Sequence, residues 1–188
     1  DYIDNLPIQL MMYDNIEADD VIGTLVDASQ EFGKNEPIMI VSSDKDFAQL
    51  QKYNNVKQYS PLKKTFVVEN NPRQQLLELI LKGDTSDGVP NVLSNDNCFV
   101  EGIRQTPLRQ TTIDTLVKDI KAMGDEVYRN YCRNKKLIDL EETPSLVKSK
   151  ILNSFDEQDN IVNNRSKVFP YLVENRCRML LEDIEDFI

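Results

Sequence analysis

The feature that most constrains the fold of this chain is a short apolar run that ends in two closely spaced aspartates. Residues 38–41 are all apolar, which is typical of a strand buried on both faces of a parallel sheet. Asp44 and Asp46 follow this run, and residues 47–50 have the pattern of a helix start. Acids at the carboxyl end of such a strand lie where open α/β sheets bind ligands, so we expect a shared cation here. The alternative is that Asp44 caps the helix and Asp46 lies in its first turn.

A second acidic cluster opens an earlier helix. Glu17, Asp19 and Asp20 precede an apolar stripe at helical spacing that extends to Phe32, and Gly33 ends the pattern. Negative charge in a first turn suits the positive end of a helix, which is one interpretation. Three acids in so short a segment exceed what that effect needs. Because the first of them would precede the regular helix, we expect all three to reach one cation.

A third acidic cluster lies in a segment punctuated by glycine and proline. Asp84 and Asp87 fall between Gly83 and Pro90, which predicts a tight loop. Taken alone, both aspartates are explained as turn residues whose side chains bond to the nearby backbone. The three clusters together are stronger evidence for a metal site than any one of them. Each lies at the end of a predicted element in an alternating α/β region.

The rest of the pattern predicts an α/β fold with a helical C-terminal part. We expect a strand over residues 8–13, a hairpin over 55–60 and 64–68, and a helix from Asn71 to Lys82. A polar loop over 91–106 follows. Further helices are expected over 109–123, 126–134, from 143 onward and over 165–175, before an acidic amphipathic tail at 180–188. The domains are expected to be a metal-binding core over 1–90 and a helical part over 91–188.

The composition excludes several classes of chemistry. The 188 residues contain no histidine, which excludes histidine-dependent nucleophilic catalysis and histidine-based zinc sites. The net charge of −10 argues against a simple basic nucleic-acid binder, unless bound cations invert the sign of a local cluster. The three cysteines show no metal-ligand spacing, and no apolar run has the length of a membrane span. We therefore expect a reduced, cytoplasmic setting without membrane contact.

Positive charge gathers in the predicted helical part. A solvated helix face is the ordinary explanation, and contact with nucleic-acid phosphates is the alternative. The basic residues concerned are Lys118, Lys121, Arg129, Arg133, Lys135 and Lys136.

The three acidic segments EADDVIG, SSDKDFAQL and KGDTSDGVPNV, in this order and spacing, resemble the 5′-nuclease superfamily of flap endonucleases and polymerase-associated 5′-exonucleases. The segments NVKQYSPLKK, EGIRQTPLRQT and LIDLEETP extend the resemblance over most of the chain, towards the ribonuclease H branch of T-even phages. It implies a PIN-like α/β nuclease with a central, mainly parallel sheet flanked by helices. It also implies two Mg²⁺ ions, replaceable by Mn²⁺, and hydrolysis of phosphodiester bonds near the 5′ ends of RNA–DNA hybrids, flaps or nicked duplex DNA.

The resemblance also implies a biological setting and a set of ligands. The setting is RNA primer removal in DNA replication, in a host cytoplasm if the source is a phage, with a replication protein such as a single-stranded-DNA-binding protein as a partner. Glu17 and Asp19 match first-metal ligands, Asp44 a bridging or first-metal ligand, and Asp46 and Asp87 second-metal ligands; these are the expected catalytic residues. Asp20 and Asp84 complete the expected metal set.

The sequence departs from the family pattern in two ways. The family's first strand, with its essential aspartate, and the arch that follows it are absent, so we expect this chain to be part of a longer nuclease. The glycine-rich loop that holds a monovalent cation is also absent. Two alternatives therefore stay open: an inactive nuclease-like module that binds DNA or a replication protein, and a haloacid-dehalogenase-type phosphatase with Asp44 as nucleophile. The second would require a Ser or Thr where Phe47 and Ala48 stand.

Overall fold

The computed structural model describes residues 9–31, 34–159, 168–182 and 184. The chain forms two compact units, of which the larger comprises residues 18–145 and the smaller residues 1–17 with 146–188. The expected division at residue 90 stays a prediction.

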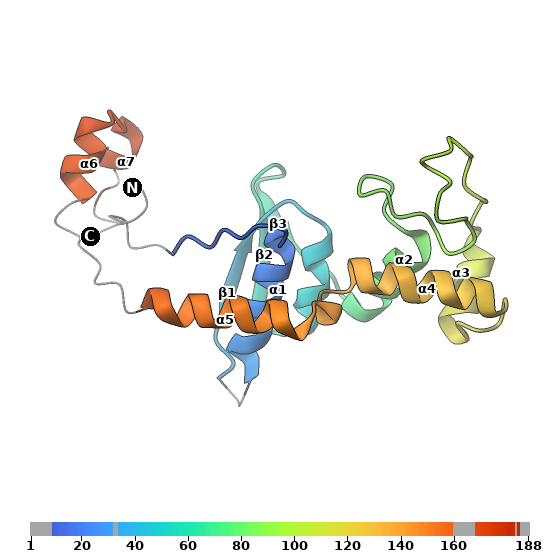
Figure 1. Cartoon of the computed structure of the whole chain (residues 1–188). Coiled ribbons are helices and arrows are strands. Elements are labelled where there is room, and N and C mark those ends of the chain that lie inside the picture. The colour runs from blue at the N-terminus through green and yellow to red at the C-terminus, as the bar shows by residue number, and fades with distance from the viewer. Residues whose placement is uncertain (1–8, 32–33, 160–167, 183, 185–188) are drawn as a thin grey trace. The chain divides into compact units, whose positions relative to one another are not determined.

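The larger unit contains a three-stranded sheet (Figure 1). Strands β1 (Ile38–Val41) and β2 (Val56–Ser60) are parallel, with Ile38 opposite Val56. Strand β3 (Thr65–Val67) pairs with β2 in antiparallel fashion, so the predicted hairpin is confirmed. The sheet thus has one parallel and one antiparallel pair, and the α/β class is confirmed.

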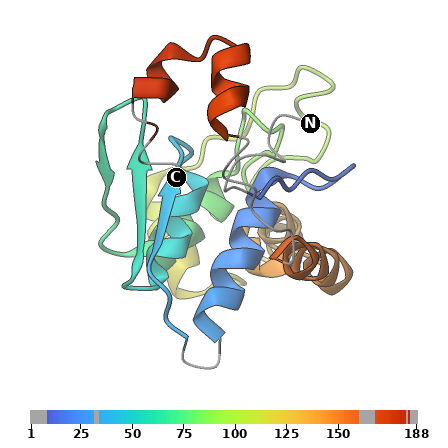
Figure 2. The same cartoon turned by 90° about the vertical axis from the view of Figure 1, so that its left-hand side faces the viewer.

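Two helical segments cover one face of this sheet. Helix α1 (Ala18–Gln30) and the 3₁₀ helix η3 (Asp46–Lys52) enclose a core with β1 and β2. Figure 2 shows α1 lying beside the strands. The core side chains are Val26, Ile40, Phe47, Leu50 and Val56. This packing fixes the carboxyl end of β1 next to the start of α1, the arrangement on which the acidic clusters depend.

The opposite face of the sheet is open in the part of the chain that the structure describes. Met39 and Val41 are 53% and 65% exposed, and Phe66 is 50% exposed. The expectation that β1 is buried on both faces is therefore wrong for the described residues. Its apolar run reflects burial of Ile40 on one face, while the alternate side chains point to the other face because a strand has a period of two.

The second half of the larger unit is helical. Asn71 caps helix α2 (Pro72–Lys82) through its side chain, which accepts a hydrogen bond from the Gln74 amide. Helices α3 (Gln110–Lys118) and α4 (Asp125–Ile138) pack with α2 around Leu81, and the short η4 (Leu140–Glu142) follows. The loop between α2 and α3 has no regular helix or strand, as predicted. It is fastened by hydrogen bonds, among them Thr106 N to Ser94 Oγ at 3.0 Å.

The described part of the smaller unit is mainly helical. Helix α5 (Ser145–Asp159) begins at the boundary, and α6 (Val168–Glu174) and α7 (Arg178–Glu182) follow. The strand expected over 8–13 is wrong for residues 9–13, which have no strand partner; instead Lys150 of α5 lies over the Tyr13 ring at 5.3 Å. Parts of two expected segments lie outside the described residues. They are residues 165–167 of the expected 165–175 helix, and residues 183 and 185–188 of the expected tail.

The structure also describes the three cysteines and the apolarity of the helices. Cys98 is buried, Cys132 and Cys177 are half-buried, and all three are free thiols. Among the described residues, no helix combines the length and apolarity needed to span a bilayer.

Candidate metal centre

The loop after β1 presents Asp44 and Asp46 from a position fixed by β2. Gln58 of β2 is 1% exposed, and its amide donates hydrogen bonds to the backbone carbonyl oxygens of Ser42, at 3.0 Å, and Asp44. The Ser43 hydroxyl lies 2.8 Å from that of Ser60. Asp44 Oδ1 also accepts a bond of 3.0 Å from the Asp46 amide, so its expected role at the helix start coexists with any ligand role.

The loop after α2 presents Asp84 and Asp87. Gly83 has φ +68° and ψ −177°, a conformation open essentially to glycine, and an added Cβ would lie 2.4 Å from the Val89 carbonyl oxygen. The amide of Val89 closes the loop by donating to the Asp84 carbonyl oxygen at 2.7 Å. The loop holds Asp84 where its carboxylate forms an ion pair with Lys45, just after β1.

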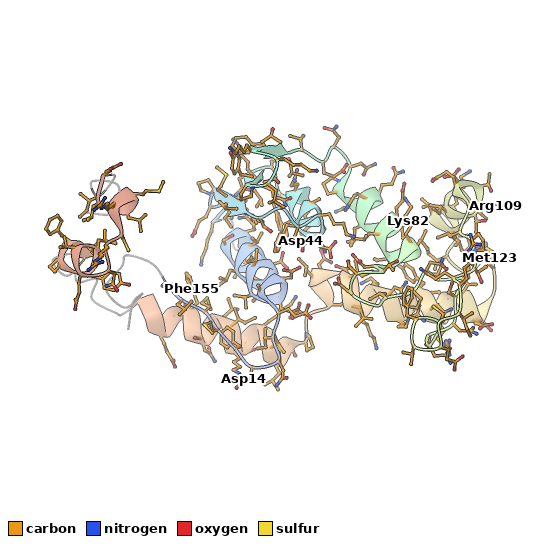
Figure 3. All side chains as sticks on the ribbon, turned by 90° about the horizontal axis from the view of Figure 1, so that it is seen from above. Asp14, Asp44, Lys82, Arg109, Met123 and Phe155 are labelled. Carbon is orange, nitrogen blue, oxygen red and sulfur yellow. The ribbon has the colours of Figure 1, made fainter. Side chains whose placement is uncertain are left out.

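These elements bring five of the seven predicted ligands into two overlapping triplets. Asp19, Asp44 and Asp46 each place one carboxylate oxygen within 4.8 Å of the other two, and Asp46, Asp84 and Asp87 do the same. Figure 3, which labels Asp44, shows it beside the start of η3. Asp46 belongs to both triplets, whereas the sequence had suggested Asp44 as the bridging residue. If each triplet held a cation, Asp46 would contribute to both sites.

Burial raises the pKa of Asp46 to about 6, and the neighbouring charge of Asp44 adds to this effect. Its Oδ1 atom is buried and has no hydrogen-bond partner among the described residues. A buried carboxylate oxygen without a donor is costly, and a bound cation would satisfy it. The donor set, made of carboxylate oxygens alone, is also the one that Mg²⁺ and Mn²⁺ prefer. The residues present therefore fit a divalent cation.

Asp84 has the opposite electrostatic environment. It is only 5% exposed, and burial alone would raise its pKa, but hydrogen bonds from Lys45 and Ser86 outweigh that effect and lower it to about 2. The Lys45 ammonium lies 2.6 Å from Asp84 Oδ2, and the Ser86 amide donates to Oδ1 at 2.9 Å. Asp84 is thus held ionised, which suits a metal ligand.

Two predicted ligands lie outside the triplets. Glu17 is exposed and immediately precedes α1, at the end of the smaller unit. Asp20 accepts a hydrogen bond of 2.7 Å from the Thr143 hydroxyl. Helical geometry explains the difference between Asp19 and Asp20, because residues one apart on a helix face different directions.

Sequence reasoning missed the residues that support the triplets. Lys45 was passed over between two aspartates, although a lysine inside an acidic pair is a signal of charge compensation. Gln58 belonged to a strand whose alternation suggested a half-exposed hairpin, and nothing local marked its burial. The buried asparagines of α4, which bond to backbone carbonyls of the α2 end and its loop, were missed for the same reason; they are Asn130 and Asn134.

Part of the basic charge of the helical region is already paired within the protein. Arg129 and Arg133 both contact Asp96, and Lys135 pairs with Asp139 at 3.0 Å and with Glu142. These pairs fit the ordinary structural explanation. The remaining predicted cations, Lys118, Lys121 and Lys136, are exposed.

Comparisons with known proteins agree with the geometry. Residues 1–77 match the 5′-3′ exonuclease, N-terminal resolvase-like domain, and residues 71–187 match the family described as T4 RNase H, C terminal. The chain is 32% identical over 192 residues to a protein named ribonuclease H from Enterobacteria phage T4, covering 97% of this chain and 61% of that relative. The match over residues 71–187 extends across more than half of the sequence, so the chain belongs to the T4 RNase H C-terminal family.

Proposed function

We propose that this chain is part of a 5′-nuclease that hydrolyses phosphodiester bonds with two divalent cations, Mg²⁺ or Mn²⁺. The observation that carries the proposal is the pair of carboxylate triplets that share Asp46, whose Oδ1 is buried without a partner. The family supports it, since its matched relative is a ribonuclease H. Because the chain spans 61% of that relative's length, the activity of this chain by itself is part of the test.

The ligand assignment follows the triplets. Asp19, Asp44 and Asp46 would hold the first cation, and Asp46, Asp84 and Asp87 the second. Glu17 and Asp20, outside the triplets, are proposed to act through water. Two cations held in this way supply an activated water and stabilise the charge that develops on the leaving oxygen.

The protein's own residues prepare this site. Gln58 holds the segment that carries Asp44 and Asp46 through hydrogen bonds to its backbone. The two carboxylates therefore need little reorganisation when a cation binds. Asp84 is kept ionised by its donors. Asp46 must lose its proton to bind a cation, so its raised pKa weakens cation binding progressively as the pH falls below about 6.

The proposed substrate is the 5′ end of an RNA–DNA hybrid, a flap or a nicked duplex, as in RNA primer removal during DNA replication. The exposed lysines of the helical part, Lys118, Lys121 and Lys136, would contact phosphates, and cations in the acidic site would offset the net charge of −10. A single-stranded-DNA-binding protein is the proposed partner, and the cytoplasm, of a host cell for a phage protein, the proposed location.

Cleavage of 5′-labelled substrates in the presence of Mg²⁺ tests this function. An RNA–DNA hybrid and a 5′-flap duplex are incubated with the chain, with Asp46→Asn, and with Asp114→Asn as a control. Asp114 is an exposed acid of α3 that pairs with Gln110 and lies outside both triplets. Short labelled products from the chain and the control, and none from Asp46→Asn, are expected.

Absence of cleavage by every protein, with Mg²⁺ still bound, would support the alternative of an inactive module that binds nucleic acid. The phosphatase alternative gains nothing from the geometry. Phe47 and Ala48, where that family would need a hydroxyl side chain, are 2% and 5% exposed and belong to the buried residues.

A further inference from the structure

Lys45 stands between two ligands of the proposed cation site and forms an ion pair with a third. Its ammonium lies 2.6 Å from Asp84 Oδ2. The other oxygen of Asp84 accepts hydrogen bonds from the Ser86 amide and hydroxyl. Both oxygens of this buried carboxylate therefore already face donors, so a cation that joins Asp84 to Asp46 and Asp87 must share or replace one of them.

Of these donors, Lys45 is the one that can leave. The Ser86 donors belong to the same turn as Asp84, two residues away, and are fixed by the loop. The Lys45 side chain is 56% exposed and ends a flexible four-carbon stem. An ammonium and a divalent cation repel each other, and Mg²⁺ binds oxygen at about 2.0–2.1 Å, so the two cannot both contact Asp84 Oδ2 without strong repulsion.

The two triplets differ in how directly Lys45 interacts with their carboxylates. Lys45 makes its hydrogen bond to Asp84, while its interaction with Asp44 and Asp46 is electrostatic only. Asp84 belongs to the second triplet and not to the first. The competing ammonium therefore acts mainly on the second cation.

We propose that Lys45 is a built-in counter-cation that occupies the second cation position of the metal-free protein and weakens binding of the second divalent ion. The first ion binds at Asp19, Asp44 and Asp46 while Lys45 stays paired with Asp84. The second ion binds only when the Lys45 ammonium leaves Asp84 and turns to solvent. This inference rests on the proposed two-cation site. It makes Lys45 the residue that sets the concentration of divalent ion at which the centre becomes complete.

Titration with Mn²⁺ tests the role of Lys45 without reference to activity. The number and affinity of bound ions are measured by isothermal titration calorimetry and by the loss of the electron paramagnetic resonance signal of free Mn²⁺. Both measurements use the full chain and its Lys45→Gln variant. Lys45→Gln is expected to tighten the second binding step by about tenfold, the change that corresponds to removal of a modest competing interaction, while the first step changes less. Lys45→Arg keeps the charge and should stay close to the unmodified chain.

The matched control is Lys82→Gln. Lys82 also pairs with a carboxylate, Glu78 at 2.8 Å, and it ends α2 just before the loop of Asp84, where Figure 3 labels it. This variant should leave both steps unchanged. Two ions bound to Lys45→Gln with an unchanged or weakened second step would overturn the role of Lys45 and leave the two-cation site intact. Fewer than two ions bound to every protein would overturn the two-cation site, and this inference with it.

Discussion

Gln58, at the centre of β2, donates a side-chain hydrogen bond to the backbone carbonyl oxygen of Asp44. The same amide group also reaches the carbonyl oxygen of Ser42. A buried polar residue of the sheet thus holds the acidic loop through its backbone. It is a positioning residue for the proposed centre.

Replacing Gln58 with methionine should separate positioning from stability. The change removes both donors but also removes the buried Oε1 atom, which lacks a partner, so the loss in unfolding free energy should be only about 1 kcal/mol. Mn²⁺ affinity of the first step should fall more clearly, because Asp44 and Asp46 lose their support. Gln110→Met, at an exposed position of α3, is the control for chemical denaturation and Mn²⁺ titration. Unchanged affinity in Gln58→Met would contradict the positioning role.

The raised pKa of Asp46 predicts a pH-dependent stability of the metal-free protein. Because the folded pKa of about 6 exceeds the ordinary value of 3.8, this group stabilises the fold below about pH 4, and that contribution disappears as the pH rises through 6. Asp46→Asn in the presence of a chelator should therefore be more stable than the unmodified chain at pH 7, by about 1–2 kcal/mol once solvent screening of this half-buried carboxyl is allowed for, and similar to it at pH 4.

Denaturant unfolding at both pH values measures this difference. Saturating Mg²⁺ should reverse the order at pH 7, since only the carboxylate gains the cation's stabilisation. Asp114→Asn should track the unmodified chain throughout. A constant difference between Asp46→Asn and the unmodified chain from pH 4 to 7 would show that Asp46 has an ordinary pKa.

The two glycines that bound the loop of Asp84 should respond differently to substitution. Gly88→Ala meets only the strain of a positive φ of +73°, because no heavy atom lies within 4 Å of its added Cβ. A loss of about 1 kcal/mol is expected. Gly83→Ala adds a Cβ 2.4 Å from the Val89 carbonyl oxygen and should cost about 3 kcal/mol or more. Thermal unfolding measures both, and equal losses would contradict the crowding at Gly83.

Asn134 should be among the most sensitive polar positions of α4. It is fully buried, and its amide donates hydrogen bonds of 2.8 Å to the carbonyl oxygens of Ile80 and Pro90. Asn134→Ala should lower the unfolding free energy by about 1–3 kcal/mol, because buried carbonyls lose a donor. The control is Asn97→Ala, at an exposed position of the α2–α3 loop. Denaturant unfolding that shows equal stability for both variants would contradict this role.

Local patterns in the sequence were sufficient to predict the elements that hold the acids. The apolar run before Asp44, the hairpin after it and the Asn71-Pro72 helix start are decided by neighbouring residues, and the structure has all three. The expected strand at residues 8–13 shows the limit of this approach, since alternation alone does not provide a partner strand. Residues 9–13 pair with no strand in the part of the chain that the structure describes.

The sequence predicted which acids form the site better than it predicted the contacts that hold them. Five of the predicted acids meet in the two triplets, but the shared position of Asp46 depends on burial, which no local pattern reports. The hydrogen bonds of Gln58 and Asn134 join residues far apart in the sequence. Such contacts are set by the packing of whole elements, so single residues give no signal of them.

The bond from Asn134 to Pro90 spans 44 residues of sequence, and this separation has a consequence for synthesis on the ribosome. At about 5–20 residues per second, the segment carrying Asp84 and Asp87 is complete roughly 2–9 s before the residue that fastens it has been added. A chain released before Asn134 has been added would therefore contain every acid of the two triplets but lack the hydrogen-bond donor that holds one of their loops.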